Sequence, residues 1–404
     1  MADAATGGAH AHRHADGVDV PTARRLAHDA GAARLLPPAP LPLDECGGTV
    51  LAAPLVARSD APSVDSSAMD GFAVRGEGPW SVVDRVLAGA VARRALTPGE
   101  AAEVATGAPV PAGTERVLPI EDVTVDGSRV ALTGPWPSRR HVRRRGEQVT
   151  AGTVLLDAGV PVSAAVLGLA ASAGADSLTV RRRPRVGALL TGDELVTSGV
   201  PRPGQVRDAV GPLLPGLVEH LGGRPVEARR SGDDARALGA ALDSLLATDA
   251  DVVVTCGMAG AGPADHLHAW LGDIGASLVV DGVAVRPGHP QLLAVLPDGR
   301  PLVGLPGNPL AAVAALLLLL GPVLDGMTGR VGPPAARVRL VGAVPSGRPV
   351  TSLVPVRRGT EPGTVEAAGP AGPAQLWGLA LADAVAVVPP GAGPQDLVEL
   401  LPLP

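Results

Sequence analysis

Polar loops follow three short apolar runs in the middle of this chain, and their residues could bind an anion or a metal ion. The loops are Thr191–Leu195, Gly257–Gly262 and Pro306–Pro309. Apolar runs of this length that end in such turns, with helical patterns between them, are typical of a doubly wound parallel sheet. Because ligands bind at the carboxyl ends of the strands in such sheets, we expect the three loops to converge on one site.

The charged residues in and around these loops indicate what the site would bind. The carboxylates are Asp193, Glu194 and Asp265, and the cations are Arg286 and His289. Carboxylate oxygens are ligands for Mg²⁺, and cations stabilise phosphate groups. The set therefore favours a phosphorylated or nucleotide-like ligand, with Mg²⁺ bridging a phosphate and a carboxylate.

The turn Pro306–Pro309 precedes a leucine-rich run and has two interpretations. Asn308 can cap a helix and Pro309 can take its first position, which by itself would explain both residues. The same geometry leaves backbone N–H groups that favour a phosphate or another oxyanion. Asp233 and Asp234 precede another helical pattern, where capping is again the simpler explanation.

Two further motifs lie in the first third of the chain, among short alternating runs that are typical of β-strands. They are the string Ser66–Val74 and the loop Thr106–Gly113. A buried turn and a plain structural loop are their simpler interpretations. The segment Ser138–Gln148 carries five arginines, which would form either a solvated face or an anion-binding patch.

The composition argues against several classes of protein. The sequence has no lysine, so it cannot contain a Walker A loop, and it lacks a Rossmann fingerprint and a Gly-x-Ser-x-Gly elbow. Its net charge of −6 and the absence of a long basic tract exclude nucleic acid as an expected partner. The two cysteines are too few for a disulfide framework, which fits a reducing cytoplasm.

Neither a signal peptide nor a membrane span is expected. Residues 1–17 are predicted to form a disordered His-rich tail, although the histidines His10, His12 and His14 could also bind a metal. The apolar run Leu310–Leu320 ends at Gly321-Pro322 and is shorter than the roughly 20 residues that span a bilayer. We therefore predict a buried core helix there and no membrane partner.

The elements that must position these residues indicate a multidomain α/β protein. Helices are predicted at 18–35, 162–173, 208–221, 234–247 and 265–273. The first two should pack on each other, so that a β-rich module is inserted between two halves of one domain. Short β runs separated by Pro/Gly turns follow residue 331 and predict a C-terminal β-barrel.

Six strings now connect these motifs to a known family. They are Ser67-Ala-Met-Asp-Gly71, Thr106-Gly-Ala-Pro-Val-Pro111, Arg145-Gly-Glu147, Thr191-Gly-Asp-Glu-Leu195, Pro287-Gly-x-Pro290 and Leu305-Pro-Gly-Asn-Pro309. In this order they resemble the molybdopterin molybdenumtransferases, the family of MoeA and the gephyrin E domain. The resemblance runs from about Val18 to the C-terminus.

The resemblance implies a fold and an activity. The expected domains are a linker and dimerisation domain (18–46 plus 143–182), an inserted β-rich domain (47–142), a three-layer α/β/α molybdopterin-binding domain (183–328) and a β-barrel (329–404). A homodimer is expected, with a cleft between the α/β domain of one subunit and the inserted module of the other. The substrates would be molybdate and adenylylated molybdopterin, with Mg²⁺-dependent release of AMP, and the molybdopterin adenylyltransferase would be a protein partner.

Carried over motif by motif, the resemblance also implies site residues. The catalytic set would be Asp70, Thr106, Glu194 and Asp265, and the metal ligands would be Asp193, Glu194 and Asp265. The implied substrate-binding residues are Gln148, Asp208, Asp234, Gly257, Gly262, Arg286, His289, Pro306, Gly307, Asn308 and Pro309. Arg286 and His289 occupy the two lysine positions of the family.

The chain departs from the family pattern at five positions: Gln148, Ala209, Met258, Gly260 and His289. Gln148 removes an acidic charge, Met258 would add bulk near the ligand, and Gly260 removes a hydroxyl. Histidine, unlike lysine, is only partly charged at neutral pH. Two functions therefore remain open, an active molybdenum insertase and a non-catalytic paralogue that binds molybdopterin or a partner.

Overall fold

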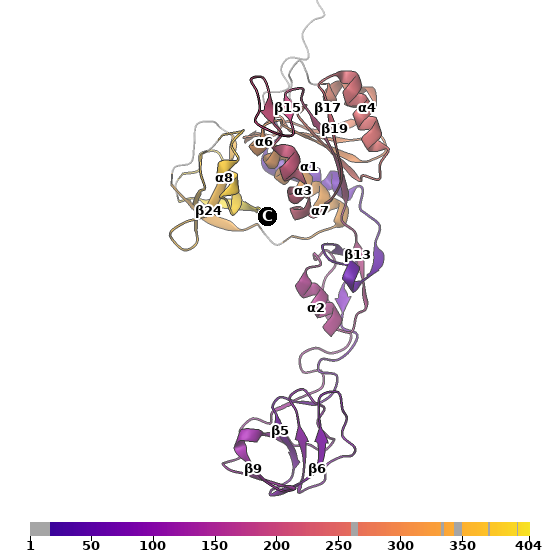
Figure 1. The fold of residues 1–404 in the computed structure, drawn as a ribbon, viewed down its shortest axis with the longest axis vertical. Helices are drawn as coiled ribbons and strands as arrows, with labels where there is room; N and C mark the ends of the chain where they lie inside the picture. Colours follow the sequence, from indigo (N-terminus) through magenta and orange to yellow (C-terminus); the bar gives the residue numbers. More distant parts are fainter. Residues whose placement is uncertain (1–16, 260–265, 333–334, 343–349, 371, 394) are drawn as a thin grey trace, which may run out of the picture.

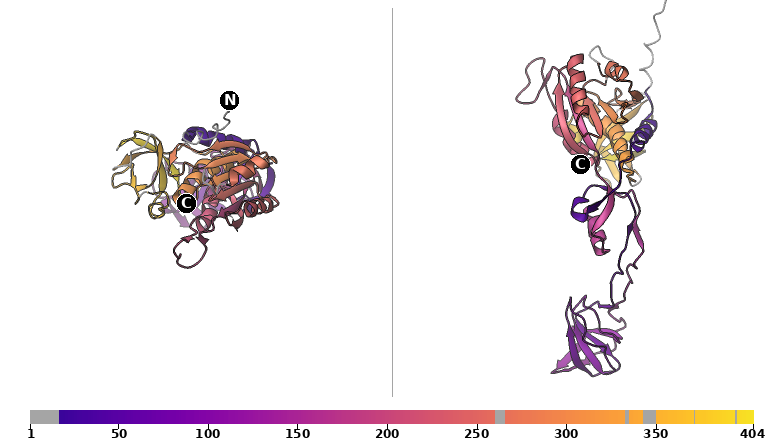
Figure 2. Two further views of the ribbon diagram at one scale, coloured as in Figure 1. Left: turned by 90° about the horizontal axis from the view of Figure 1, so that it is seen from above. Right: turned by 90° about the vertical axis from the view of Figure 1, so that its right-hand side faces the viewer.

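The computed structural model describes residues 17–259, 266–332, 335–342, 350–370, 372–393 and 395–404. Figure 1 shows an elongated chain, with an α/β body and a small barrel side by side at one end and a β-rich module at the other. The side view in Figure 2 shows the same separation. Residues 1–16 of the predicted tail, Gly260, Gly262 and Asp265 lie outside the described residues.

A six-stranded mixed sheet forms the centre of the α/β body. Its strands in spatial order are β17 (Arg224–Ser231), β14 (Arg185–Thr191), β18 (Val252–Cys256), β22 (Pro301–Leu305), β21 (Leu292–Val295) and β19 (Ser277–Asp281). The first four are parallel, whereas β21 is antiparallel to both of its neighbours. The expectation of an all-parallel sheet is wrong at β21, because the connection 296–300 to β22 is too short for a crossover.

Side chains of the central strands alternate between two cores. In β14, Ala188 and Leu190 face one core and Leu189 faces the other, as expected for a strand that is buried on both sides. Helices cover both faces: α1 (Val20–Ala32) and α3 (Val210–His220) lie on the first, and α4 (Ala235–Leu246) and α5 (Leu267–Asp273) lie on the second. The predicted three-layer α/β/α arrangement is therefore confirmed.

A long apolar helical run, Pro309–Thr328, also lies in the first core. It consists of α6 (Pro309–Ala315), a π-helical turn η3 (Leu316–Leu320) and α7 (Gly321–Thr328). It has 20 residues and is apolar enough to cross a membrane, but 89% of its most apolar window is buried inside the fold. The predicted buried helix is confirmed.

The apolar run Leu310–Leu320 ends at Gly321-Pro322, but the helix itself continues to Thr328. Proline has no N–H to donate to the preceding turn and its ring crowds the carbonyl four residues earlier. The π-helical turn lies directly before Pro322 and widens the helix there. A proline that normally ends a helix is thereby accommodated within one.

Helix α1 packs directly on α7, and two glycines allow this contact. A Cβ on Gly31 would collide with the carbonyl group of Val323, and a Cβ on Gly326 would collide with the α1 backbone at His28 and Ala32. The two helix backbones therefore touch, and only glycine leaves enough space at both positions.

The predicted packing of the first two helices on each other is wrong. Helix α2 (Ala164–Ser172) belongs to a separate small core below the body in Figure 1. It shares that core with the three-stranded sheet β1 (Ala39–Pro42), β13 (Ser177–Arg181) and β2 (Val50–Leu51). The periodicity of a helix identifies its buried face, but it does not identify the partner that covers this face.

The β-rich module stands apart from the body. Its sheet has the order β8 (Arg116–Pro119), β5 (Gly71–Arg75), β7 (Glu100–Val104), β6 (Trp80–Val86), β10 (Arg129–Leu132) and β9 (Val123–Asp126). Two short ladders lead to it, β3 (Leu55–Val56) with β12 (Val154–Leu156), and β4 (Ser66–Ser67) with β11 (Val142–Arg143). The chain thus enters and leaves along paired strands, which confirms the predicted insertion.

The C-terminal strands close into a barrel, as predicted. The ring consists of β24 (Thr351–Arg358), β25 (Thr364–Ala367), β23 (Arg337–Val341), β27 (Leu397–Pro402) and β26 (Ala384–Val388). The pairing of β26 with β24 completes it, and the short helix α8 (Trp377–Ala380) connects β25 to β26. The strand β20 (Val285–Arg286) of the body pairs with β24 from outside the ring, and this pairing joins the two domains.

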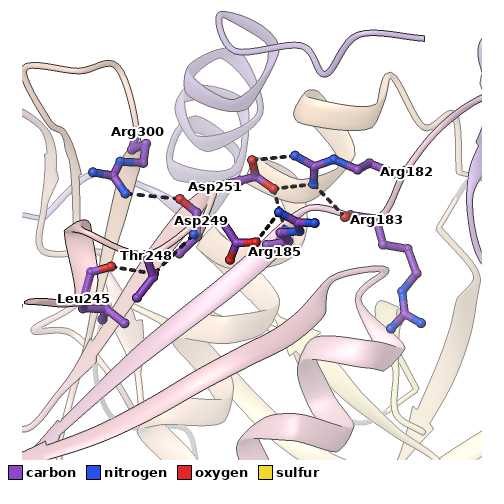
Figure 3. A network of polar contacts seen from close by, with 9 residues as sticks. Arg182, Arg183, Arg185, Leu245, Thr248, Asp249, Asp251 and Arg300 are labelled. Carbon is purple, nitrogen blue, oxygen red and sulfur yellow. Dashed lines mark hydrogen bonds and ion pairs between the residues drawn. The ribbon is translucent and has the colours of Figure 1, made fainter. Parts of the chain in front are cut away.

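At the amino end of the sheet, Asp251 connects β18 to the segment that leads into β14. Its carboxylate accepts hydrogen bonds from the Arg182 guanidinium at 2.6 and 2.9 Å and from the backbone N–H of Arg185 at 2.7 Å, and Figure 3 shows this group. Burial raises the pKa of Asp251, but the hydrogen bonds from Arg182 and Arg185 outweigh it and lower the pKa overall.

The contact between α1 and α7 can be tested with Gly326→Ala. The added Cβ meets the backbone of α1, so we expect the free energy of unfolding to fall by about 1–3 kcal/mol. Gly216→Ala in α3 is the control, because no atom lies within 4 Å of its Cβ position and alanine favours a helix by about 1 kcal/mol. Urea denaturation measures both; equal stabilities would show that the two backbones are not in contact.

The Asp251 group predicts a pH dependence of stability. We expect Asp251→Asn to lower the free energy of unfolding by about 1–3 kcal/mol at pH 7. Because the folded pKa of Asp251 is depressed, its contribution is present above the unfolded pKa of about 3.9 and is lost as the pH falls through the folded value. The difference between wild type and variant should therefore shrink in acid.

Asp249→Asn serves as the control for this prediction. Asp249 pairs with Arg185, but its side chain is 64% exposed, and exposed pairs contribute about 1 kcal/mol or less. If Asp249→Asn lowered the free energy of unfolding as much as Asp251→Asn does, the role given to the buried carboxylate would be contradicted.

Candidate functional site

The carboxyl ends of β14, β18 and β22 meet at one edge of the sheet. The Thr191 hydroxyl donates to the carbonyl of Cys256 at 3.0 Å, and the N–H of Gly257 donates to Leu305 at 3.3 Å. Gly257 has a φ of +113°, and a Cβ on it would lie 2.5 Å from the carbonyl oxygen of Thr191. The Cβ position of Gly307 lies 3.7 Å from Gly257. The predicted convergence of the three loops is confirmed.

Asp193 and Asp233 hold the loops after β14 and β17 together. The N–H of Asp193 donates to the Asp233 carboxylate at 3.2 Å, and the N–H of Asp233 donates back at 3.4 Å. Glu194 follows in the same turn and is exposed, and its backbone carbonyl accepts from Val206. The Asp193 and Asp233 carboxylates thus meet at this edge, and carboxylate oxygens are of the kind that Mg²⁺ prefers.

Within the described ranges, no group of three or more His, Cys, Asp or Glu residues is close enough to hold a metal ion. The proposed third metal ligand, Asp265, lies outside these ranges. The metal ligands therefore stay a prediction.

The carboxylate of Asp208 is deeply buried at the start of α3, following the short ladder β15 (Leu195–Val196) and β16 (Val206–Arg207). The residue is 5% exposed. Its carboxylate accepts from Arg230 at 2.7 Å and from the N–H of Gly211 at 2.8 Å. These bonds fix the orientation of Asp208. Arg230 was not among the predicted residues, although its place near the end of β17 puts it at the same edge.

Cys256 ends β18 at this edge, but its thiol is not a nucleophile. Burial raises its pKa to about 12, with a smaller contribution from the charge of Asp208. The thiol is therefore protonated at neutral pH, and protonated buried thiols are unreactive.

Asp234 and Asp233 have different roles in the structure. The carboxylate of Asp234 accepts from the N–H of Ala237 at 2.9 Å and caps α4, so the simpler explanation of this residue is observed. Asp233 reaches Asp193 instead. Asp234 was the predicted substrate-binding residue, whereas the structure turns its neighbour Asp233 toward the other carboxylates.

The start of α6 differs from the expectation. Asn308 is at the capping position, but its side chain makes no capping hydrogen bond. The N–H groups of Leu310 and Ala311 donate to the carbonyl of Pro373, at 3.0 and 3.4 Å. The expectation that this helix start is open to an oxyanion is wrong for these two N–H groups, because the segment before α8 already supplies an acceptor.

The two predicted cations lie beside the barrel. Arg286 is exposed in β20, opposite Ser352 of β24. The Nδ1 atom of His289 forms a hydrogen bond with the carbonyl of Val283 at 2.8 Å, and the residue is half-buried. The imidazole of His289 therefore helps to hold its own turn.

Asp70 and Thr106 meet at the surface of the β-rich module. The N–H of Thr106 donates to the Asp70 carboxylate at 2.7 Å. The two motifs also interlock through their backbones, because Ser67 donates to Ala108 at 2.9 Å and Gly107 donates to Ser67 at 2.8 Å. Two motifs that are distant in the sequence thus form one small surface. Figure 1 shows β5, the strand that follows Asp70, at the opposite end of the molecule from β15.

The last two arginines of the arginine-rich segment form ion pairs within the fold. The side chains of Arg144 and Arg145 pair with Asp65 and Asp60, respectively, both at 2.5 Å. Backbone N–H donors and these arginines lower the pKa of both aspartates. Gln148 is exposed on the same segment, and its N–H donates to Ala61 at 3.0 Å. The segment therefore joins the outgoing and returning parts of the chain that connect the body to the β-rich module, which we call the neck.

Comparison with known proteins identifies the family. The family models for the MoeA N-terminal region (domain I and II) and for a probable molybdopterin binding domain match residues 18–174 and 187–326, respectively. Molybdopterin molybdenumtransferase 2 of Mycobacterium tuberculosis is 34% identical over 383 residues, which cover 90% of this chain and 92% of that protein. The chain belongs to the molybdopterin molybdenumtransferase family.

Other members of the family agree. The molybdopterin molybdenumtransferase of a Nostoc species is 36% identical over 296 residues, covering 70% of this chain and 67% of the relative. A molybdopterin biosynthesis MoeA protein from Pyrococcus horikoshii superposes with a TM-score of 0.79 at 23% identity, over 96% of this chain and 100% of that one. This second likeness concerns the fold alone.

The departures from the family pattern can now be located. Met258 is 2% exposed and packs in the core with Leu189 and Leu242. The side chain therefore points into the fold, and the effect of its bulk on a ligand stays a prediction. Ala209 lies at the capping position of α3 without a side-chain bond, and Asp208 supplies the acceptor instead.

The position of Met258 predicts the effect of removing it. Met258→Ala should lower the free energy of unfolding by about 2–5 kcal/mol, because a buried side chain is replaced by a cavity. Met258→Leu keeps the volume and should cost less than about 1.5 kcal/mol. Urea denaturation distinguishes the two. An alanine variant as stable as the wild type would place Met258 outside the core.

Proposed function

We propose that this protein inserts molybdenum, supplied as molybdate, into adenylylated molybdopterin and releases AMP. The family is one support. The observation that carries the proposal is the meeting of Thr191, Gly257 and Gly307 at one edge of the sheet, beside Asp193 and Glu194. Glycines there let a ligand approach the backbone closely, and the carboxylates suit the metal that such an anionic substrate needs.

The residues of the chain have distinct roles in this proposal. Asp193 and Glu194, with Asp265, would hold Mg²⁺, which supplies charge to neutralise the phosphates during cleavage. Asp208 would act indirectly, because its buried carboxylate is held by Arg230 and by the N–H of Gly211. Molybdate would bind near Pro306–Pro309, using N–H groups other than the two that donate to Pro373, or displacing that carbonyl.

The proposal includes a homodimer. Asp70 and Thr106 belong to the β-rich module, and Figure 1 shows strand β5 of this module at the opposite end of the molecule from β15, the strand that follows Glu194. Within one chain the two surfaces are therefore too distant to act on the same substrate. A second copy could bring its module to the α/β body of the first. We further propose that the protein acts in the cytoplasm and receives its substrate from the molybdopterin adenylyltransferase.

A second candidate function is binding of molybdopterin without turnover. The observation that favours it is His289, which takes a family lysine position but bonds to the carbonyl of Val283. A short side chain held to its own turn in this way cannot reach toward a substrate as the long, flexible side chain of a lysine can.

Purified protein with adenylylated molybdopterin, Mg²⁺ and molybdate separates the two functions. Insertion releases AMP and produces cofactor that reconstitutes an apo-molybdoenzyme. Glu194→Gln should lower AMP release roughly 100-fold or more, because a charge at the reacting phosphates is lost. Glu219→Gln, on the exposed side of α3, is the matched control and should leave the rate unchanged.

Each outcome decides between the candidates. Tight binding of adenylylated molybdopterin without AMP would reject the insertase and support the binding protein. Unchanged turnover in Glu194→Gln would show that Glu194 does not take part in the reaction. If the protein neither binds adenylylated molybdopterin nor releases AMP, both functions are rejected.

A further inference from the structure

The neck has no apolar core along part of its length. Residues 58–65 and 144–153 run between the ladder of β3 with β12 and the ladder of β4 with β11, and none of these described residues is buried. Where two parts of a chain are closely packed, their contacts fix the angle between them. In this part of the neck, only hydrogen bonds and ion pairs can fix the direction in which the β-rich module leaves the body.

Backbone hydrogen bonds join the two segments of the neck around one residue, Ala61. Its N–H donates to the carbonyl of Val149 at 2.8 Å, and its carbonyl accepts from the N–H of Gln148 at 3.0 Å. The carbonyl of the next residue, Pro62, accepts from Gly146 at 2.9 Å. Bonds gathered at one place keep the segments together, but they resist a rotation of the module about that place only weakly.

Asp60 adds a side-chain contact next to this place. Its carboxylate accepts hydrogen bonds from the side chain of Arg145 at 2.5 Å and from the N–H of Ala151 at 2.8 Å. The bond from Ala151 and the bond from Arg145 lower the pKa of Asp60, so the carboxylate is charged at neutral pH. Both donors lie in the neck rather than in the module.

Asp65 connects the neck to the small surface of the module. Its carboxylate accepts from the side chain of Arg144 at 2.5 Å and from the N–H of the next residue at 2.8 Å. Its backbone carbonyl accepts from Val110 at 3.0 Å, in the loop that begins at Thr106. Asp65 also directly precedes β4, the strand that leads to Asp70. One residue therefore contacts the returning segment and both motifs of the surface.

Arg145 joins the two aspartates to each other. Its backbone N–H donates to Asp65 and its side chain donates to Asp60, so a rotation of the module would pull on one of the two bonds. Charge-assisted bonds of this kind are short and directional. Exposed ion pairs contribute about 1 kcal/mol or less to stability, so their main effect here concerns the direction of the module and not the stability of the fold.

We propose that Asp60 and Asp65 are positioning residues of the reaction. Together they fix the direction of the β-rich module on the neck, and thereby the place at which Asp70 and Thr106 meet the α/β body of a second copy. This inference rests on the proposed function and on its homodimer. The two aspartates act through the neck and do not touch the substrate.

The rate of AMP release tests the role in the reaction. Asp60→Ala and Asp65→Ala should each lower kcat roughly tenfold or more, because a small misplacement of reacting groups is costly. The KM should not change, because the module acts only in the transition state of this scheme. Asp65→Asn keeps an oxygen acceptor of the same shape and should retain more activity than Asp65→Ala. Asp126→Ala removes the same charge from an exposed position of β9 and should match the wild type.

Spin labels on the full-length chain test the direction of the module. Ala165→Cys in α2 and Arg129→Cys in β10 place one exposed cysteine on each side of the neck, and both native cysteines are buried. Dilution of the doubly labelled chain with unlabelled protein restricts the measured distances to one chain. We expect a narrow distance distribution without a further change, and a distribution at least roughly twofold broader with Asp60→Ala or Asp65→Ala, because few other contacts hold the neck.

The two measurements separate failure of this inference from failure of the proposed function. If the wild type released no AMP, the proposed function would fail and the role in the reaction with it, while the distance distributions would still decide whether the aspartates hold the neck. If the wild type is active, an unchanged kcat in both alanine variants would overturn the inference. A lower kcat with unchanged distance distributions would overturn it too. Circular dichroism establishes that each variant is folded, and Asp60→Ala, whose bonds lie within the neck, keeps the test decisive if Asp65→Ala is not.

Discussion

The burial of the helical run Pro309–Thr328 is the contact on which the rest of the structure depends. One continuous core joins this run to the sheet, to α1 and α3, and to barrel residues such as Leu353 and Val385. Its first residues follow Asn308 at the candidate site, and its last part, α7, packs on α1. A fully packed element of this length is rigid, so the position of the candidate site depends on the packing of this helix.

The elongated shape divides the chemistry of the chain between two ends. The α/β body holds the loops around Thr191, Gly257 and Gly307, and the β-rich module holds Asp70 and Thr106. The neck between them consists of short ladders and of the ion pairs of Arg144 and Arg145. The two surfaces are therefore separated within one chain, and in the homodimer that we propose a second copy would bring them together.

Arginine carries the electrostatic structure of this lysine-free chain. Asp251 is bound by Arg182, and the buried Asp208 is bound by Arg230. The planar guanidinium can satisfy a carboxylate with two parallel hydrogen bonds, which makes it suited to buried pairs. Within the described residues, the Nε atoms of Arg229 and Arg330 are buried without an acceptor.

The sequence by itself determined the local features of this protein. Apolar runs that end in glycine-rich turns predicted β14, β18 and β22, capping residues predicted the start of α4, and the order of motifs indicated the family. These signals are local, because strand length, helix periodicity and turn chemistry depend on neighbouring residues. The tertiary structure alone decided the reversal of β21, the packing of α1 on α7, the inward direction of Met258, the pairing of Asp208 with Arg230 and the contact of Pro373 with α6. Each joins segments that are distant in the chain, and which distant segments meet depends on the packing of the whole fold rather than on any local pattern.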